Sequence, residues 1–571
     1  MKKNKREIIF CLIIGIACFI FLVQFLAVRK RVISGNIVDV VNSVIYPGTL
    51  VLENGKIKDI IRDDKAYDNF ILPGFIDAHV HVESSMLVPS EFARLASSHG
   101  TVATVSDPHE IANVLGIPGI EYMLNDARKV PFKFFFGASS CVPATKFETA
   151  GAALSALEID GLLSRGEIKY LSEMMNYPGV IEKDPEVMLK LDMARKHNKP
   201  IDGHAPGLLG ESLKEYAHAG ITSDHESYQY EEGLQEVGLG MKVIIREGSA
   251  AKDFDALHPL IMQFPESCMF CSDDKHPDDL VKGHIDQLVK RALALGYDKM
   301  LVLRCASYNP VKHYGLEVGL LQKNDYADFI VIDNFDNFRV LKVYINGRLV
   351  AENGRSLIKR MPAEIKNNFF AHKKKITDFT VKAKSGMINV IEAIDGKLIT
   401  ARSKVLPKVF SGYVVSDPER DILKITVVNR YKDAPPAVAF VKNFGLKKGA
   451  IASSFAHDSH NVVAVGVSDY DIARAVNLVI RNHGGLAIVY DNKEEVLKLP
   501  VAGLMSLEDG YLVAQQYSRM TAKARELGSN LRAPFMTLSF MALLVIPEIK
   551  LSDKGLFDGN NFKIIDLFTE R

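Results

Sequence analysis

Leu72-Pro73-Gly74-Phe75-Ile76-Asp77-Ala78-His79-Val80-His81 is an apolar run that ends in two histidines one residue apart, and it decides the fold. Polar residues that directly follow an apolar strand lie at the C-terminal mouth of an α/β barrel, where such enzymes carry out their chemistry. Alternate residues of a strand point the same way. We therefore expect both imidazoles, His79 and His81, to reach one metal ion.

Outward from this stretch, apolar or β-branched runs alternate with helical stretches such as residues 185–197. Strands that alternate with amphipathic helices are typical of a parallel sheet covered by helices. The runs lie at residues 71–76, 101–105, 132–136, 168–171, 201, 221–223, 243–245 and 268–271. These eight runs predict an α/β fold, a (β/α)8 barrel of the TIM type, over residues 71–314.

The segments on both sides of the predicted barrel are rich in strand patterns. Residues 32–70 hold short β-type runs separated by the turn signals Pro47-Gly48 and Asn54-Gly55. After the barrel, residues 327–332 and 340–350 form similar runs, with Asn346-Gly347 as a hairpin turn. We expect residues 32–70 and 315–365 to form one composite β-sandwich domain. Residues 370–571 read as a separate C-terminal α/β domain, joined through a lysine-rich linker around residues 373–375.

Residues of metal-ligand type also follow the ends of four of the later runs. They are Glu173, His204, His225 and Asp273. Imidazoles and carboxylates suit Mn²⁺, Fe²⁺ or Zn²⁺. A bridging carboxylate lets two ions sit about 3.5–4 Å apart. Together with the two histidines of the first run, these residues predict a binuclear hydrolytic site.

A different zinc pattern competes for part of this set. His81-Val82-Glu83 and Cys268-Met269-Phe270-Cys271 resemble the two halves of the cytidine-deaminase zinc motif. Ser267 stands where that motif has proline, and nearly 190 residues separate the two halves. We therefore interpret the cysteines as packing around the eighth strand.

Composition excludes several classes of protein. The 571 residues are too many for one core and predict two to four domains. Hydrophobic residues at 47% and charged residues at 24% exclude a disordered chain and a multi-span membrane protein. Lys plus Arg (70) balance Asp plus Glu (69), so no nucleic-acid partner is expected. Six cysteines without framework spacing favour a reducing compartment, and we place the catalytic part in the cytoplasm.

The N-terminus is unusual for such an enzyme. Residues 8–28 form a 21-residue stretch whose only clearly polar member is Gln24. About 20 apolar residues suffice to cross a bilayer, so segment 1–31 is predicted to hold one transmembrane helix that would anchor the chain. A cleaved signal peptide fits less well, because the run continues into Arg29, Lys30 and Arg31. Basic residues flank both ends, so the orientation stays open; an extension without a membrane role is the alternative.

The motifs resemble a known family. Residues 72–81 look like the first-strand motif of the amidohydrolase superfamily, and Glu83-Ser84-Ser85-Met86 with Asp107-Pro108-His109-Glu110-Ile111 is similar to bacterial adenine deaminases. Further matching stretches are residues 140–144, 173–180, 245–250 and 456–461. The resemblance runs from about residue 32 to the C-terminus. It implies adenine as the substrate, a C-terminal domain peculiar to these deaminases, and two divalent ions, Mn²⁺ first, with Fe²⁺ or Zn²⁺ as alternatives.

The resemblance also implies roles for individual residues. Metal-activated water would attack C6 of adenine, with Glu173 as the bridging ligand and Asp273 as the proton carrier. Glu83 or Asp107 would protonate ring N1, although each could equally be a partner that orients a ligand histidine. Lys169, four residues before Glu173, is the alternative bridge, since some members of the superfamily use a carbamylated lysine. Glu173 is preferred because it lies nearer the C-terminal end of the strand.

The C-terminal domain and the competing functions complete the prediction. His457, Asp458 and His460 form a polar cluster that would either cover the barrel mouth and bind the substrate or be a solvated loop. Another amidohydrolase chemistry, on a different purine or a cyclic amide, would favour a lysine bridge. A membrane-tethered, non-catalytic scaffold would be expected to have lost ligands, whereas all six are present. We also expect a homo-oligomer.

Overall fold

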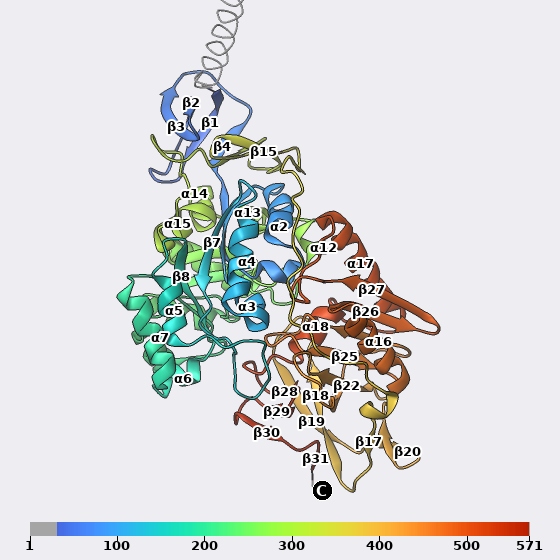
Figure 1. Ribbon diagram of the computed structural model, residues 1–571. Helices are drawn as coiled ribbons and strands as arrows, with labels where there is room; N and C mark the ends of the chain where they lie inside the picture. Colours follow the sequence, from blue (N-terminus) through green and yellow to red (C-terminus); the bar gives the residue numbers. More distant parts are fainter. Residues whose placement is uncertain (1–30, 570–571) are drawn as a thin grey trace, which may run out of the picture.

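The computed structural model describes residues 31–569 and is shown in Figure 1. The chain forms a barrel, a sheet built from the segments that flank it in sequence, and a C-terminal region of mixed α/β structure. In the figure the flanking sheet lies at one end of the barrel and the C-terminal region lies beside and below the barrel. This arrangement leaves the two additions on different parts of the barrel surface.

The eight barrel strands are parallel and pair in chain order. They are β5 (Phe75–Val80), β6 (Thr101–Ser106), β7 (Lys133–Ala138), β8 (Ile168–Met174), β9 (Ile201–Gly203), β10 (Ser223–Asp224), β11 (Lys242–Arg246) and β12 (Cys268–Cys271). A parallel bridge between Val80 and Asp273 closes the ring. The predicted barrel is therefore confirmed, and each strand overlaps or adjoins one of the eight apolar runs.

Helices follow the barrel strands and cover the outside. The main ones are α2 (Pro89–Ser97), α3 (His109–Leu115), α4 (Ile117–Ala127), α5 (Ala156–Leu163), α7 (Pro185–Lys196), α8 (Gly210–His218), α9 (Tyr230–Gly238) and α13 (Ile285–Ala294). The side chain of Asp184 caps α7 by accepting from the amides of Glu186 and Val187, and Pro185 occupies the first turn, where a missing amide hydrogen costs nothing. These local signals explain why the helix begins where the sequence predicts it.

One eight-stranded sheet combines both flanks of the barrel. Its order is β16-β15-β14-β13-β4-β1-β2-β3. The strands are β1 (Arg31–Asp39), β2 (Val44–Glu53), β3 (Lys56–Arg62), β4 (Phe70–Pro73), β13 (Phe329–Ile332), β14 (Val340–Ile345), β15 (Arg348–Glu352) and β16 (Arg355–Ser356). Asn346 and Gly347 adopt φ of 48° and 68°, which a tight hairpin between β14 and β15 requires.

The apolar run at residues 71–76 is divided between the two sheets. β4 pairs with β1 and β13 in the flanking sheet, whereas β5 begins the barrel, so the boundary placed at residue 70 lies inside β4. Gly74 stands between the two strands. A Cβ atom at Gly74 would lie 2.3 Å from Cγ1 of Val102, so only glycine lets the chain pass this close to β6.

The C-terminal region is built on a nine-stranded sheet. Its strands are β18 (Met387–Ala393), β19 (Thr400–Val405), β22 (Ile422–Val428), β23 (Ala437–Lys442), β24 (Ala450–Ser453), β25 (Val462–Gly466), β26 (Gly485–Tyr490), β27 (Lys493–Lys498) and β31 (Phe568–Thr569). Helix α16 (Asp469–Arg481) packs its apolar face on β24, β25 and β26. Residues 357–375, which include the predicted linker, form an extended connection with no helix or strand.

Smaller elements surround this sheet. Two helices, α17 (Gly510–Glu526) and α18 (Pro534–Phe540), lie between it and the barrel. Two three-stranded sheets complete the region: β17 (Val381–Lys382), β20 (Lys408–Phe410) and β21 (Tyr413–Val415), and β28 (Ile549–Ser552), β29 (Gly555–Asp558) and β30 (Lys563–Ile565).

Contacts join the C-terminal region to the loops that follow the barrel strands. The Thr149 hydroxyl and amide donate to the carboxylate of Asp553 at 2.7 and 2.8 Å, and Asn461 Nδ2 donates to the Thr149 carbonyl at 2.9 Å. Because Thr149 lies in the loop after β7, the C-terminal region covers the mouth of the barrel, where the strands end. The flanking sheet adjoins the opposite end, since β4 leads directly into the start of β5.

The fold class predicted from the sequence needs one correction. None of the helices found between residues 31 and 569 combines the length and apolar character that crossing a bilayer requires. The transmembrane helix is therefore not supported as a part of the predicted fold class. The stretch for which it was predicted, residues 8–28, lies outside the described residues.

Candidate metal centre at the barrel mouth

The two histidines of the first strand form the base of the site. His79 and His81 leave β5 on the same side, and their Nε2 atoms lie 3.2 Å apart. The Nδ1 atom of His81 lies 3.2 Å from the carbonyl oxygen of Asp107, so Nδ1–H donates there and the Nε2 lone pair faces the centre. Both side chains are buried. The alternation of the strand thus places both rings as the sequence predicts.

Glu173 lies between two pairs of histidines. Its Oε1 is 3.2 Å from Nε2 of His81, and its Oε2 is 2.7 Å from Nδ1 of His204 and 3.2 Å from Nε2 of His225. Burial would raise the pKa of this carboxyl, but the surrounding histidines hold it well below its usual value. Glu173 therefore stays ionised, with one oxygen directed at each pair, as a bridging ligand must be.

Asp273 completes the set. Its Oδ1 lies 3.2 Å from Nε2 of His81 and 3.8 Å from Nε2 of His79. The residue has a φ of 51°, and its amide donates to the carbonyl of His79 at 2.9 Å, so the turn after β12 is bound to the end of β5. The closure of the barrel itself therefore fixes the position of this carboxylate.

The donor set fits a pair of divalent ions. Imidazole nitrogens and carboxylate oxygens from the six predicted residues fall into groups whose atoms lie within 4.8 Å of one another, including His79 with His225 and Asp273, and Glu173 with His204 and His225. Buried lone pairs that converge in this way need a positive charge between them. Four nitrogen and two carboxylate ligands are typical of Mn²⁺, Fe²⁺ or Zn²⁺ sites.

Lys169 lies away from this centre. Its Nζ lies 3.8 Å from Oε2 of Glu317 and is partly exposed, near the start of β8, whereas Glu173 lies near the end of that strand. The strand rises by about 3.3 Å per residue, so four residues separate the two side chains by most of the barrel height. Of the two possible bridges, only Glu173 lies among the histidines.

The two candidate acids differ in their surroundings. Oδ2 of Asp107 lies 3.1 Å from Nδ1 of His109, and its Oδ1 accepts from the Ser139 hydroxyl at 3.3 Å. Oε1 of Glu83 accepts the amide hydrogen of Ile111 at 3.2 Å, while Oε2 has no partner among residues 31–569. Burial raises the pKa of Glu83 to about 7. Asp107 is thus engaged with neighbours, whereas Glu83 keeps a free oxygen.

The polar loop of the C-terminal region reaches the barrel mouth. Nδ1 of His457 lies 2.5 Å from Oε1 of Glu110, and His460 contacts the other oxygen of the same carboxylate. Oδ1 of Asp458 lies 3.8 Å from Nε2 of His109. Burial lowers the pKa of His457, but the neighbouring carboxylates of Glu110, Asp274 and Asp458 together outweigh it and raise the value to about 9. All three side chains are buried, so the loop is not a solvated one, and its binding of the substrate stays a prediction.

Sequence reasoning missed several residues of the site. The Nη1 atom of Arg246 donates to Oδ2 of Asp273 at 2.9 Å, its Nη2 donates to Oε2 of Glu226 at 3.1 Å, and its Nε donates to Asp253 at 2.9 Å. Glu110, described above, was also given no role. Glu226 and Arg246 lie at the ends of β10 and β11, so the rule that identified the metal ligands also pointed to them. Arg246 is not a metal ligand by type, and His225 was chosen at the same strand end as Glu226.

The cysteines of the competing zinc pattern belong to the barrel wall. Cys268 begins β12 and Cys271 ends it, and both are buried and free. The Cys271 thiol donates to the Ile244 carbonyl at 3.9 Å on the neighbouring strand. Cys268 lies at the end of the barrel opposite His81, so the two halves of the pattern do not form one site.

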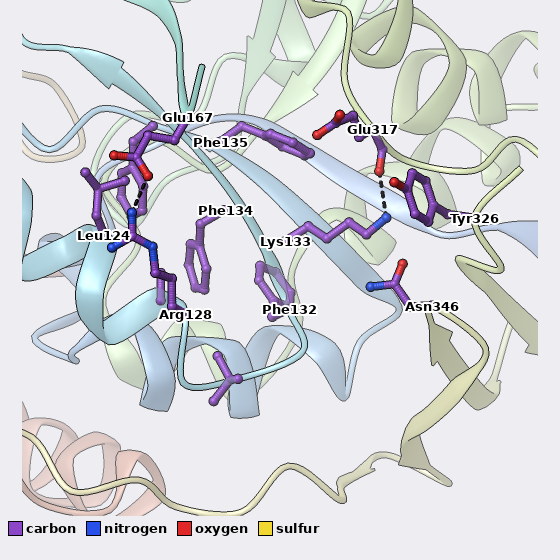
Figure 2. Close-up of a pocket in the computed structure, with 13 residues that line it drawn as sticks. Leu124, Arg128, Phe132, Lys133, Phe134, Phe135, Glu167, Glu317, Tyr326 and Asn346 are labelled. Atoms are coloured by element: carbon purple, nitrogen blue, oxygen red, sulfur yellow. Dashed lines mark hydrogen bonds and ion pairs between the residues drawn. The ribbon is translucent and has the colours of Figure 1, made fainter. Parts of the chain in front are cut away.

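A hollow near the barrel strands lies away from this centre. It has a volume of about 340 Å³ and is lined by residues at the start of β7, where Lys133 extends between Glu317 and Tyr326 (Figure 2). Nζ of Lys133 bonds to Asp328 and to the Glu317 carbonyl at 2.6 Å each. Because β7 begins there, this hollow lies at the end of the barrel away from the histidines.

Two family models match the chain. The model described as "Amidohydrolase family" matches residues 70–350, and that described as "Adenine deaminase C-terminal domain" matches residues 397–563. Together they cover the barrel, strands β4, β13 and β14 of the flanking sheet, and most of the C-terminal region.

Curated relatives match over nearly the full length. A protein of Sulfurovum sp. named adenine deaminase is 56% identical over 534 residues, which cover 93% of this chain and 99% of that protein. Adenine deaminases of Salinibacter ruber and Methanosarcina mazei are 54% and 51% identical, each over 94% of this chain and 99% of the relative. A solved β-aspartyl dipeptidase of Fervidobacterium islandicum is 15% identical with a TM-score of 0.45, and covers 59% of this chain and all of that one.

Proposed function

The chain belongs to the adenine deaminase family of amidohydrolases, and from this premise we propose that it hydrolyses adenine to hypoxanthine and ammonia at the barrel mouth. The observation that carries the proposal is the position of Glu173 between two pairs of histidines, in a chain that matches adenine deaminases over nearly its whole length. The free cysteines of the described residues fit the cytoplasm, which we propose as the compartment.

Six residues would hold two divalent ions. Their imidazole nitrogens and carboxylate oxygens lie close together at the barrel mouth. The six are His79, His81, His204, His225, Glu173 and Asp273. We propose Mn²⁺ as the native ion, and Fe²⁺ and Zn²⁺ suit the same ligands. Ions bound there would lower the pKa of a water molecule to near 7 and so supply hydroxide at neutral pH.

Asp273 is the proposed proton carrier. Arg246 binds Oδ2 of this carboxylate, so that Oδ1 stays directed at His81 and the centre. From there Oδ1 can accept the proton of the attacking water and deliver it to the amino group that leaves C6. Full turnover by Asp273→Asn with unchanged metal content would contradict this role.

Glu83 is the proposed acid for ring N1. A carboxyl group whose pKa lies near the working pH is suited to donate a proton, and the free oxygen of Glu83 is available for it. The carboxylate of Asp107 instead contacts His109, and its backbone carbonyl oxygen lies 3.2 Å from Nδ1 of the ligand His81, which supports the alternative role, a partner that orients a ligand histidine. We further propose that His457, Asp458 and His460 close the mouth over the substrate, because they contact the first turn of α3, the helix that follows β6.

The decisive experiment measures ammonia and hypoxanthine released from adenine by the full chain reconstituted with Mn²⁺. We expect turnover with two bound ions, and its loss in His79→Ala. Two bound ions without adenine turnover would indicate that the substrate is another purine or a cyclic amide. A chain that binds no metal would instead favour a non-catalytic scaffold.

A further inference from the structure

A buried aspartate, serine and histidine meet beside the proposed metal ligands and have no part in the proposed reaction. Asp77 lies two residues before His79 in β5, Ser272 lies one residue before Asp273 at the end of β12, and His284 directly precedes α13. Asp77 and His284 are fully buried, and Ser272 is 1% exposed. Polar groups this deeply buried are costly unless they bond to one another, so their contacts indicate their role.

The arrangement of these three side chains is not that of a nucleophilic triad. In such a triad the serine hydroxyl donates to the histidine, and the histidine donates to the carboxylate. Here the Ser272 hydroxyl donates to Oδ2 of Asp77, and Nε2 of His284 lies 2.8 Å from the same oxygen. Both donors therefore converge on the carboxylate, and the buried serine is not open to a substrate.

The carboxylate of Asp77 connects the two strands that close the barrel. Its Oδ1 accepts the amide hydrogen of Ser272 at 2.9 Å and that of His79 at 3.4 Å. The amide of Asp273 donates to the His79 carbonyl at 2.9 Å, and the amide of His81 donates to the Asp273 carbonyl at 3.4 Å. Asp77 is therefore bonded directly to the backbone that positions three of the six proposed ligands.

The turn at Asp273 needs such support. Its φ of 51° lies in the left-handed region, which costs free energy for a residue with a side chain and persists where the surrounding structure holds it. The amide and the hydroxyl of Ser272 both donate to Asp77, so the residue before this turn is held by two hydrogen bonds. Loss of these bonds would let the Asp273 carboxylate move away from His79 and His81.

His284 in turn holds the carboxylate of Asp77. Nδ1 of His284 lies 2.7 Å from the Thr101 hydroxyl oxygen, which can donate to it, so that Nε2 carries the ring proton close to Asp77. The amide of His284 donates to Oδ1 of Asp286 at 2.8 Å, and the ring of Phe92 packs edge-on against the imidazole at 5.7 Å. The imidazole is therefore fixed by its own neighbours and can fix the carboxylate.

We propose that His284 and Asp77 are positioning residues of the metal centre. Through Ser272 they hold the turn at Asp273, and so they keep that carboxylate directed at the histidines of the first strand. Partners that orient a metal ligand typically contribute about 10- to 100-fold to metal affinity. The proposal rests on the metal centre proposed above, and metal binding can test it without any measurement of turnover.

The test measures the dissociation constant of Mn²⁺ for the full chain by equilibrium dialysis. His284→Leu removes both ring nitrogens, and we expect it to bind Mn²⁺ about 10- to 100-fold more weakly at the site that includes Asp273. His284→Gln keeps an N–H donor that can reach Asp77, and it should recover most of this affinity. His313→Leu is the matched control, because His313 also contacts a threonine hydroxyl, that of Thr222 at 3.4 Å, and it should bind Mn²⁺ as the parent chain does.

Two results would overturn the proposal in a chain that binds Mn²⁺. One is a dissociation constant of His284→Leu that equals that of His313→Leu. The other is a His284→Gln variant that binds Mn²⁺ as weakly as His284→Leu, because the N–H group would then not be what matters. If His284→Leu does not fold, Ser272→Ala takes its place with the same expectation, since it removes the hydroxyl that donates to Asp77. A parent chain that binds no Mn²⁺ would contradict the proposed metal centre instead.

Discussion

At the scale of single residues, the bridging position is the most informative. Glu173 contacts both histidine pairs, while Lys169 binds Glu317 on a more exposed part of the same strand. We expect Glu173→Gln to lose at least one of two bound ions and most turnover, because the amide cannot neutralise two cations. Lys169→Met should keep both ions and lose little activity. Metal analysis beside adenine turnover checks this; metal loss in Lys169→Met would mean that the bridge is the lysine.

At the scale of strands and helices, Gly74 separates the flanking sheet from the barrel. Because a Cβ there would meet Val102 at 2.3 Å, we expect Gly74→Ala to lower the free energy of unfolding by about 1–3 kcal/mol. The cost should shrink when Val102→Ala is also present. Gly161→Ala, in α5 with no atom within 4 Å of the added Cβ, is the control and should be neutral or stabilising. Denaturant unfolding measures all four; equal costs in both backgrounds would refute the steric explanation.

A second prediction at this scale concerns Lys550 in strand β28, a buried amine whose titration should change the stability of the fold. Burial lowers the pKa of this amine to about 7, from an unfolded value near 10.5. Between these values the unfolded chain binds more protons, so the free energy of unfolding should rise with pH, by up to about 1.4 kcal/mol per pH unit from this group. Below pH 7 the group is protonated in both states and adds no slope. Lys550→Met should lack the rise; parallel pH profiles of the two proteins would show that the amine stays charged.

At the scale of the whole molecule, Glu110 joins the barrel to the C-terminal region. Its carboxylate, fully buried, contacts both His457 and His460. Removing one partner of a buried ion pair typically costs about 3–5 kcal/mol. We therefore expect Glu110→Ala to lower stability by that order and to split thermal unfolding into two transitions, which calorimetry would detect. Glu211→Ala, at an exposed position of α8, should keep the parent profile. A single unshifted transition in Glu110→Ala would mean that other contacts hold the parts together.

The oligomeric state also belongs to this scale and stays a prediction. We expect a homo-oligomer, and light scattering of the full chain would decide it. The domain boundaries predicted from the sequence likewise stay a prediction. For the boundary placed at residue 70, the pairing of β4 with the flanking sheet favours Gly74 instead.

The features that the amino-acid sequence predicted correctly depend on short-range patterns. The barrel strands and the convergence of His79, His81 and Glu173 follow from the alternation of a strand and from the meeting of parallel strand ends, which are local properties. The transmembrane prediction rested on the length and apolar character of residues 8–28, which lie outside the described residues.

The remaining features arise from contacts between distant parts of the chain. Glu110 meets His457 across more than 340 positions, and Asn461 donates to the Thr149 carbonyl across more than 300 positions. Loops carry no periodic signal, and a buried pair or a pocket wall depends on how two separately folded surfaces dock. The chain's local pattern therefore specifies the barrel and the candidate metal ligands, whereas only the tertiary structure decides which residues of the C-terminal region lie on the barrel mouth.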